Sequence, residues 1–184
     1  IIGTVKADDM DSFLSSSEGL QIKGKNAYSP MNITIEGIGE DAAIHGFGML
    51  VRNCSSVEMR NFGIYWFMDD GISLDTDNSH IWIHHLDIFY GQPGKDKDQV
   101  KGDGSVDVKG DSQYITFANL HFFDSGKMSL CGMKSETGPN YIDYHGNWFD
   151  HTDSRHPRIR TMSVHVWNNY YDGVAKYGVG ATTG

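Results

Sequence analysis

A degenerate repeat of short segments with alternating apolar residues limits what this chain can fold into more than any other feature. Each segment has a polar residue, alternating apolar residues, then Asn, Gly or His, and then a further apolar pair. Six such segments cover residues 32–38, 56–62, 80–86, 114–120, 142–148 and 164–170. Counted from the first apolar position of each, successive segments are 24, 24, 34, 27 and 22 residues apart. One structural unit therefore recurs along the whole chain.

Apolar alternation over a few residues predicts a β-strand, and no segment has the period of a helix. Strands that recur at this spacing indicate a solenoid, because each coil buries its inward side chains only by stacking on the next. The alternative is a β-sandwich, whose strands usually recur every ~8–12 residues. We therefore predict one all-β solenoid domain over residues 1–184. Its core should consist of residues two apart in each coil: Ile33, Ile35, Val57, Met59, Ile81, Ile83, Val106, Val108, Ile115, Phe117, Ile142, Tyr144, Val164 and Val166.

Loops and cysteines fit this prediction. The longest step contains an insertion at residues 91–98, whose Gly, Pro and charged residues are typical of a surface loop. The 22 glycines suit tight bends between strands. Cys54 and Cys131 fall in strand-like contexts, so we expect buried apolar fillers and no disulfide framework.

The chain is acidic, with 15 basic residues, 24 acidic residues and a formal net charge of −9. A nucleic-acid-binding protein usually has a basic surface, so we expect no such partner. No apolar run approaches the ~20 residues of a membrane span. Residues 1–22 contain Lys6, Asp8, Asp9 and Asp11 where the apolar part of a signal peptide would lie. Either a signal segment has been removed or the protein is intracellular, and we favour removal.

Two acidic motifs lie about one predicted coil apart. In residues 103–109, Asp107 and Lys109 should share the outer face of a strand, and Asp103 can curl toward the same point. One coil earlier, stacking would bring Asp69 or Asp70 beside them. Close carboxylates repel one another unless a cation lies between them, and oxygen ligands suit Ca²⁺. A solvated acidic turn is the alternative for each motif.

A basic motif follows at residues 155–160, where Arg155, Arg158 and Arg160 lie within six residues. Three guanidinium groups this close repel one another unless they meet anions, although a solvated basic turn is the alternative. Lys127 falls about one coil after Asp107 and one before Arg155. No glycosidase-like carboxylate pair, nucleophile elbow or phosphate loop stands out, and a histidine-based zinc site is not expected.

At these motifs the chain resembles the pectate lyases of polysaccharide lyase family 1. The resemblance runs from residues 32–39, through 81–85 and 106–110, to 155–160 and 164–171, and so covers nearly the whole chain. Its most specific part is the Arg-x-Pro-x-x-Arg core followed by His-x-x-Asn-Asn-x-Tyr. The resemblance implies a right-handed, single-stranded parallel β-helix that binds polygalacturonate, the acidic backbone of pectin, in a groove beside one sheet. Ca²⁺ would bridge protein and substrate carboxylates.

The resemblance also implies roles for individual residues. Asp70, Asp103 and Asp107 are similar to calcium ligands of the family. Asp69 is a rival for Asp70, because the spacing to the next segment is one residue longer than usual.

The basic residues match the catalytic and substrate-binding positions. Arg155 resembles the catalytic base, Lys127 and Arg160 resemble residues that grip substrate oxygens, and Lys109 resembles a lysine that lines the groove. A guanidinium normally keeps its proton. Crowding by cations would favour the neutral form, so we expect an alkaline pH optimum.

Two departures from the family pattern affect these expectations. His84 stands where the family has an acidic residue, which we expect next to the site. Family members are also usually far longer, so caps and groove-wall loops should be short or missing. Alternatives are a pectin lyase acting on methyl-esterified substrate without calcium, a non-catalytic pectin-binding helix, and a purely structural solenoid. We expect a secreted monomer.

Overall fold

The computed structural model describes residues 19–93 and 99–183, and each regular element in them is a β-strand. The strands are β1 (Leu20–Lys23), β2 (Ser29–Glu36), β3 (Ala43–His45), β4 (Met49–Arg52), β5 (Cys54–Tyr65), β6 (Ile72–Thr76), β7 (Ser79–Phe89), β8 (Val106–Val108), β9 (Gln113–Ala118), β10 (His121–Phe123), β11 (Leu130–Cys131), β12 (Ile142–His145), β13 (Trp148–Asp150), β14 (Arg158–Arg160), β15 (Val164–Trp167), β16 (Tyr170–Asp172) and β17 (Gly180–Thr183). In these two ranges no helix is long and apolar enough to cross a membrane. The charged positions at 6–11 and residues 94–98 of the insertion lie outside the described residues.

All pairings between these strands are parallel and form two sheets. One sheet has seven strands, in the order β1-β4-β6-β8-β11-β14-β17. The other has ten, with β15-β12-β9-β7-β10-β13-β16 as its main path. Its remaining strands join this path through the pairing of β5 with β7, and β2 and β3 pair with β5. Neighbouring strands are one coil apart in sequence, so the chain is a parallel β-solenoid, as the repeat predicts. The sandwich alternative is excluded, because sandwiches are built from antiparallel strands.

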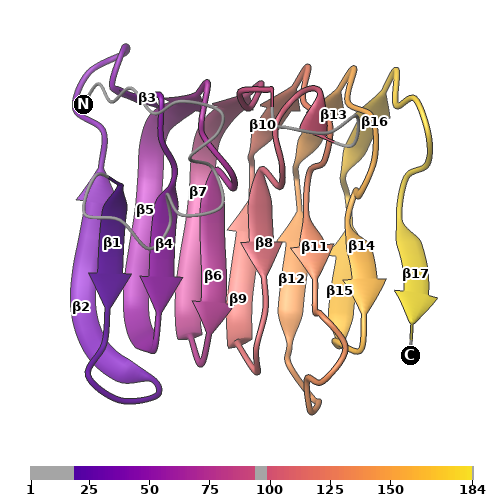
Figure 1. Ribbon diagram of the computed structural model, residues 1–184. Coiled ribbons are helices and arrows are strands. Elements are labelled where there is room, and N and C mark those ends of the chain that lie inside the picture. The colour runs from indigo at the N-terminus through magenta and orange to yellow at the C-terminus, as the bar shows by residue number, and fades with distance from the viewer. Residues whose placement is uncertain (1–18, 94–98, 184) are drawn as a thin grey trace.

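The ten-stranded sheet turns a corner, which gives each coil three faces. The first half of β7 pairs with β9 and its second half with β10, and β5 is divided in the same way between β2 and β3. In Figure 1 the seven-stranded sheet runs downward near the viewer and β2 and β9 run upward behind it, while the chain advances from left to right. This winding is right-handed, the hand that parallel crossovers almost always take.

Two continuous rows of side chains fill the coil from the ten-stranded side. Register places Ile33, Val57, Ile81, Ile115, Ile142 and Val164 in one row and Ile35, Met59, Ile83, Phe117, Tyr144 and Val166 in the next. Val106 and Val108 approach them from the opposite wall, where they pair with Ile72 and Leu74 of the seven-stranded sheet. All of these residues belong to or pack against one core cluster, so the predicted core is confirmed.

The bends explain the polar positions of the repeat. Asn61, His85, Asn119 and Asn168 occupy equivalent places and have φ between 51° and 61°. A residue in this left-handed region reverses the side-chain alternation and turns the chain onto the next face, and Asn tolerates it better than most residues. The Asn, Gly or His in each segment therefore marks a corner of the coil.

Both cysteines are buried and neither forms a disulfide, as predicted. Cys131 Sγ lies 3.1 Å from the Tyr144 hydroxyl. Burial raises the pKa of Cys131 to about 12, so its thiol stays protonated and fills space in the core.

Candidate active site

A pocket of about 340 Å³ lies on the outer side of the seven-stranded sheet and brings together residues from four successive coils. It is lined by Asp69, Asp70, Gln99, Asp103, Asp107, Lys109, Lys127, Leu130, Met133, Arg155 and Arg160. These residues flank β6, β8, β11 and β14, which are neighbours in the sheet. All seven site residues predicted from the sequence therefore lie at one place.

Three carboxylates at one end of the pocket form a cluster that could hold a cation. Asp69, Asp70 and Asp103 each offer one oxygen, and these oxygens lie within 4.8 Å of one another. Burial and the negative charges of Asp70 and Asp103 raise the pKa of Asp69 to about 7. A site built from carboxylate oxygens fits Ca²⁺. Asp69 and Asp70, which the sequence left as rivals, both belong to this cluster.

Asp107 lies in the same pocket but is more enclosed than predicted. The sequence predicted a side chain on the outer face of its strand. Its carboxylate leaves the coil interior, yet it is only 2% exposed and its Oδ1 accepts the N–H of Leu130 at 2.9 Å. Burial and the charge of Asp70 raise the pKa of Asp107 to about 7. Gly104 makes room for it, because a Cβ there would lie 2.2 Å from Asp107 Oδ1.

Lys109 forms the cationic partner of two of these carboxylates. Its Nζ donates to Asp70 Oδ2 at 2.9 Å and lies 3.5 Å from Asp107 Oδ2. Burial alone would lower the pKa of Lys109, but the charges of Asp70 and Asp107 raise it overall. Lys109 is therefore a fixed positive charge inside the pocket.

Lys127 and Arg155 converge on Asp103 from the next two coils. Isolated parallel β-bridges of the backbone, between Gly104 and Lys127 and between Lys127 and Ser154, align these coils. Lys127 is 6% exposed, and its Nζ donates to Asp103 Oδ1 at 3.0 Å. Arg155 Nη1 lies 4.0 Å from the same oxygen. Burial raises the pKa of Asp103, but the charge and hydrogen bond of Lys127 outweigh it and leave this pKa lowered.

The two arginines of β14 differ in surroundings. Arg160 lines the pocket, and among the residues that the structure describes its Nε is the one buried side-chain nitrogen or oxygen without a hydrogen-bond partner. Arg158 instead donates from Nε to Thr182 Oγ1 at 3.1 Å and does not line the pocket. A buried donor without a partner is costly, so Arg160 is poised to meet an anionic ligand.

His84 does not lie beside this pocket, so that expectation is wrong. It belongs to β7 in the ten-stranded sheet, where its Nε2 lies 3.0 Å from Glu58 Oε1 and its ring stacks on Trp82. The expectation failed because alternation along one strand does not reveal which face of the coil that strand forms.

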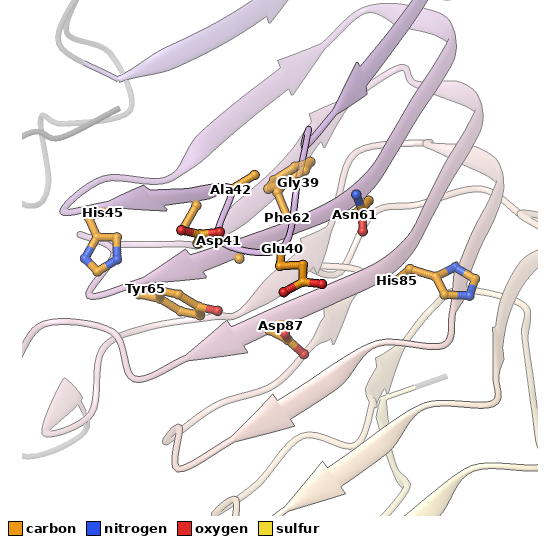
Figure 2. A pocket seen from close by; sticks show the side chains of 12 residues that line it. Gly39, Glu40, Asp41, Ala42, His45, Asn61, Phe62, Tyr65, His85 and Asp87 are labelled. Atoms are coloured by element: carbon orange, nitrogen blue, oxygen red, sulfur yellow. The ribbon is translucent and has the colours of Figure 1, made fainter.

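Two other groups of polar residues are weaker candidates. Figure 2 shows a pocket beside β5 and β7 with the carboxylates of Glu40, Asp41 and Asp87 around it and neither Lys nor Arg in its lining. A second group, Asp150, His151 and Asp172, lies on the ten-stranded sheet. There the Asp150 carboxylate already bonds to ring nitrogens of His151 and His121. Neither group combines carboxylates with the Lys and Arg side chains that an acidic substrate needs.

Sequence reasoning missed Gln99 and Met133 in the pocket. Gln99 donates from Nε2 to Asp103 Oδ2 at 3.3 Å and so helps to hold that carboxylate. Gln99 follows the charged insertion and Met133 follows β11, and neither forms part of a recognisable motif.

Comparison with known proteins agrees with this geometry. The chain is 31% identical over 159 residues to the pectate trisaccharide-lyase of Bacillus licheniformis, a match that covers 83% of the chain and 45% of the relative. It is 33% identical over 151 residues to pectate lyase A of Emericella nidulans, a match that covers 78% of the chain and 45% of that relative. The chain thus spans about half the length of these curated relatives.

Solved structures show the same fold. Pectate lyase II from Xanthomonas campestris superimposes with a TM-score of 0.75 at 25% identity, over 97% of this chain and 58% of that one. A thermostable pectate lyase gives a TM-score of 0.73 at 24% identity, over 96% and 50%. A sequence profile described as pectate lyase matches residues 14–184. The chain therefore belongs to the pectate lyase family.

Proposed function

We propose that this protein is a calcium-dependent pectate lyase that cleaves the (1→4)-α-D-galacturonan chain of polygalacturonate by β-elimination. The observation that carries the proposal is the pocket itself, where an acidic cluster lies beside Lys127, Arg155 and Arg160. Carboxylates would hold a metal ion, and the cations would hold an anionic sugar. The relatives named as pectate lyases support the same conclusion.

Asp70, Asp103 and Asp107 are the proposed calcium ligands, and Asp69 is a further candidate because its oxygen lies within the same cluster. The donor chemistry fits, since each group is a carboxylate, and burial together with the charges of Asp70 and Asp103 raises the pKa of Asp69. Calcium held by these residues would supply positive charge that stabilises the negative charge growing on a substrate carboxylate.

Side chains of the protein carry out proton removal and substrate binding. Arg155 takes the proton from C5 of a galacturonate residue. Arg160 and Lys127 bind the adjacent carboxylate as it gains negative charge, and Lys109 lines the same groove. The unpartnered Nε of Arg160 supports this role, because a substrate oxygen would satisfy it.

The electrons of the broken C5–H bond form the C4–C5 double bond, and the C4–O bond breaks as its electron pair leaves with oxygen. The leaving oxygen takes a proton from solvent, and no water is added to the sugar. The products are therefore 4,5-unsaturated oligogalacturonates.

The products test this proposal. Incubation with polygalacturonate should give fragments with the ultraviolet absorbance of a conjugated double bond and no added water by mass spectrometry. Saturated fragments would contradict it in favour of hydrolysis. Faster reaction on highly methyl-esterified pectin would indicate a pectin lyase, and binding without products would indicate a non-catalytic helix.

We also propose that the protein acts outside the cell, because polygalacturonate is a polymer of the plant cell wall. We further propose that it acts as a monomer. Secretion by the native host and sedimentation at the mass of one chain would support this. A stable dimer or retention inside cells would contradict it.

A further inference from the structure

Glu136 has no place in the site described above, but it ties together three turns that border the pocket. The residue is 8% exposed. Its Oε1 accepts the N–H groups of Gly110 at 3.1 Å and Met133 at 2.7 Å. Its Oε2 accepts the N–H of Ser135 at 3.2 Å and the hydroxyl of Thr161 at 2.7 Å. One carboxylate thus joins the ends of β8, β11 and β14.

Each of these turns carries a residue of the pocket. Gly110 directly follows Lys109, Thr161 directly follows Arg160, and Met133 itself lines the pocket. Glu136 does not line it. Its contacts therefore act on the backbone next to the cationic side chains and not on a bound substrate.

The backbone around this carboxylate is tightly packed. Gly132 has a φ of +89°, and a Cβ there would lie 1.9 Å from the carbonyl oxygen of Arg160. The Gly132 N–H donates to the carbonyl of Val108 at 2.8 Å. The turn after β11 therefore lies tightly between the end of β8, which Lys109 directly follows, and the end of β14 at Arg160. A shift of this turn would displace both Lys109 and Arg160.

The four partners of Glu136 are all neutral, so the carboxylate acts through hydrogen bonds alone. Burial would raise its pKa, but the Thr161 hydroxyl and the N–H groups of Met133 and Gly110 lower it to about 2. Glu136 therefore stays ionised at any pH at which the protein would work.

From these contacts we infer that Glu136 is a positioning residue: it sets the places of Lys109 and Arg160 in the pocket without touching the substrate. The inference rests on the proposed function for the meaning of those places. Chemistry in such a site depends on placement, since a displacement of about 1 Å can cost about a hundredfold in rate.

Three variants and a matched control test this inference. Glu136→Gln keeps the size of the side chain but replaces one accepting oxygen by an amide nitrogen, which opposes the N–H donors. Thr161→Val removes the hydroxyl, which also lies 2.7 Å from the carbonyl oxygen of Arg160, and Thr161→Ser keeps it. Asp111→Asn is the control, because Asp111 Oδ1 accepts the N–H of Thr137 at 2.7 Å and so holds the same loop at a point outside the pocket.

Steady-state kinetics on polygalacturonate should be measured for each variant well below its melting temperature. We expect Glu136→Gln to lower kcat by about tenfold to a hundredfold, with a smaller change in KM. Thr161→Val should lower kcat less, and Thr161→Ser should restore it. Asp111→Asn should keep the kcat of the parent. Equal losses in Asp111→Asn and Glu136→Gln, or an unchanged kcat in folded Glu136→Gln, would overturn the inference.

Hydrogen exchange separates this inference from the proposed function. In Glu136→Gln, peptides around Gly110, Met133 and Thr161 should exchange faster than in the parent, whereas the strands of the ten-stranded sheet should not change. A parent that forms no unsaturated product would contradict the proposed function alone. Unchanged exchange at these turns would overturn the positioning inference whether or not the parent is active.

Discussion

Arg155 and Arg158 lie three residues apart, yet the structure gives them different surroundings. Arg155 lies three residues before β14, and its Nη1 is 4.0 Å from an Asp103 oxygen inside the pocket. Arg158 lies on the strand and bonds to Thr182 outside the pocket. Chemistry at the pocket should therefore depend on one of these guanidinium groups and not on the other.

Replacement of Arg155 by Lys should lower turnover about a hundredfold or more, which is about 3 kcal/mol, because a positioned acid–base group is lost while positive charge remains. Arg158→Ala should have a much smaller effect. The kcat of both variants is measured by steady-state kinetics at alkaline pH with saturating calcium. An active Arg155→Lys together with an inactive Arg158→Ala would require another base.

The ionisation of Glu136 predicts how acid affects the folded protein. Its pKa falls from 4.5 to about 2 on folding, so it stabilises the fold above its ordinary pKa and loses that contribution as pH falls toward the lower value. The stability difference between the parent and Glu136→Gln should therefore shrink as pH falls from about 6 to about 3. Urea unfolding of both proteins measures it. A constant difference over this range would contradict the expected ionisation.

The sequence indicated the charged pocket residues because they form short motifs, such as 103–109 and 155–160, that match a known family. It could not indicate Glu136, whose role comes from backbone N–H groups in two coils and from the Thr161 hydroxyl in a third. It also misplaced His84, and it did not indicate how enclosed Asp107 is. The surroundings of both side chains depend on neighbouring coils and not on local alternation.

At the scale of single elements, the inward rows of the ten-stranded sheet were predictable because alternation directly reveals them. Phe117 shows how they stabilise the fold. Its side chain is fully buried in β9 and stacks on Tyr144 with ring centroids 4.7 Å apart. Thr116, the preceding residue, points outward between Trp82 and Asp143.

Phe117→Ala should destabilise the protein by about 3–5 kcal/mol, since it removes buried area and leaves a cavity that the stacked coils cannot close. Thr116→Ala on the same strand should change stability by about 0.5 kcal/mol or less. Denaturant unfolding measures both. Equal effects would show that the rows do not form the core.

For the whole molecule, the fold shows how an acidic chain could bind the acidic polymer of the proposed function. The net charge of −9 would repel polygalacturonate, but the parallel register stacks Lys109, Lys127, Arg155 and Arg160 at one pocket. The same register gathers the carboxylates that a metal ion would neutralise. Overall charge led us to expect no nucleic-acid partner, but only the winding of the coil determines where the cations meet.

Calcium-dependent elimination on polygalacturonate is the activity that we propose for this pocket. The most direct measurement is the initial rate of unsaturated-product formation by the parent protein, with added calcium, in excess chelator, and after calcium is restored. The carboxylates of the pocket predict that chelation abolishes the rate and that Ca²⁺ restores it, whereas an equal concentration of Mg²⁺, which prefers a smaller and more hydrated site, restores little. A full rate in excess chelator would contradict the claim and favour a pectin lyase that works without a metal ion.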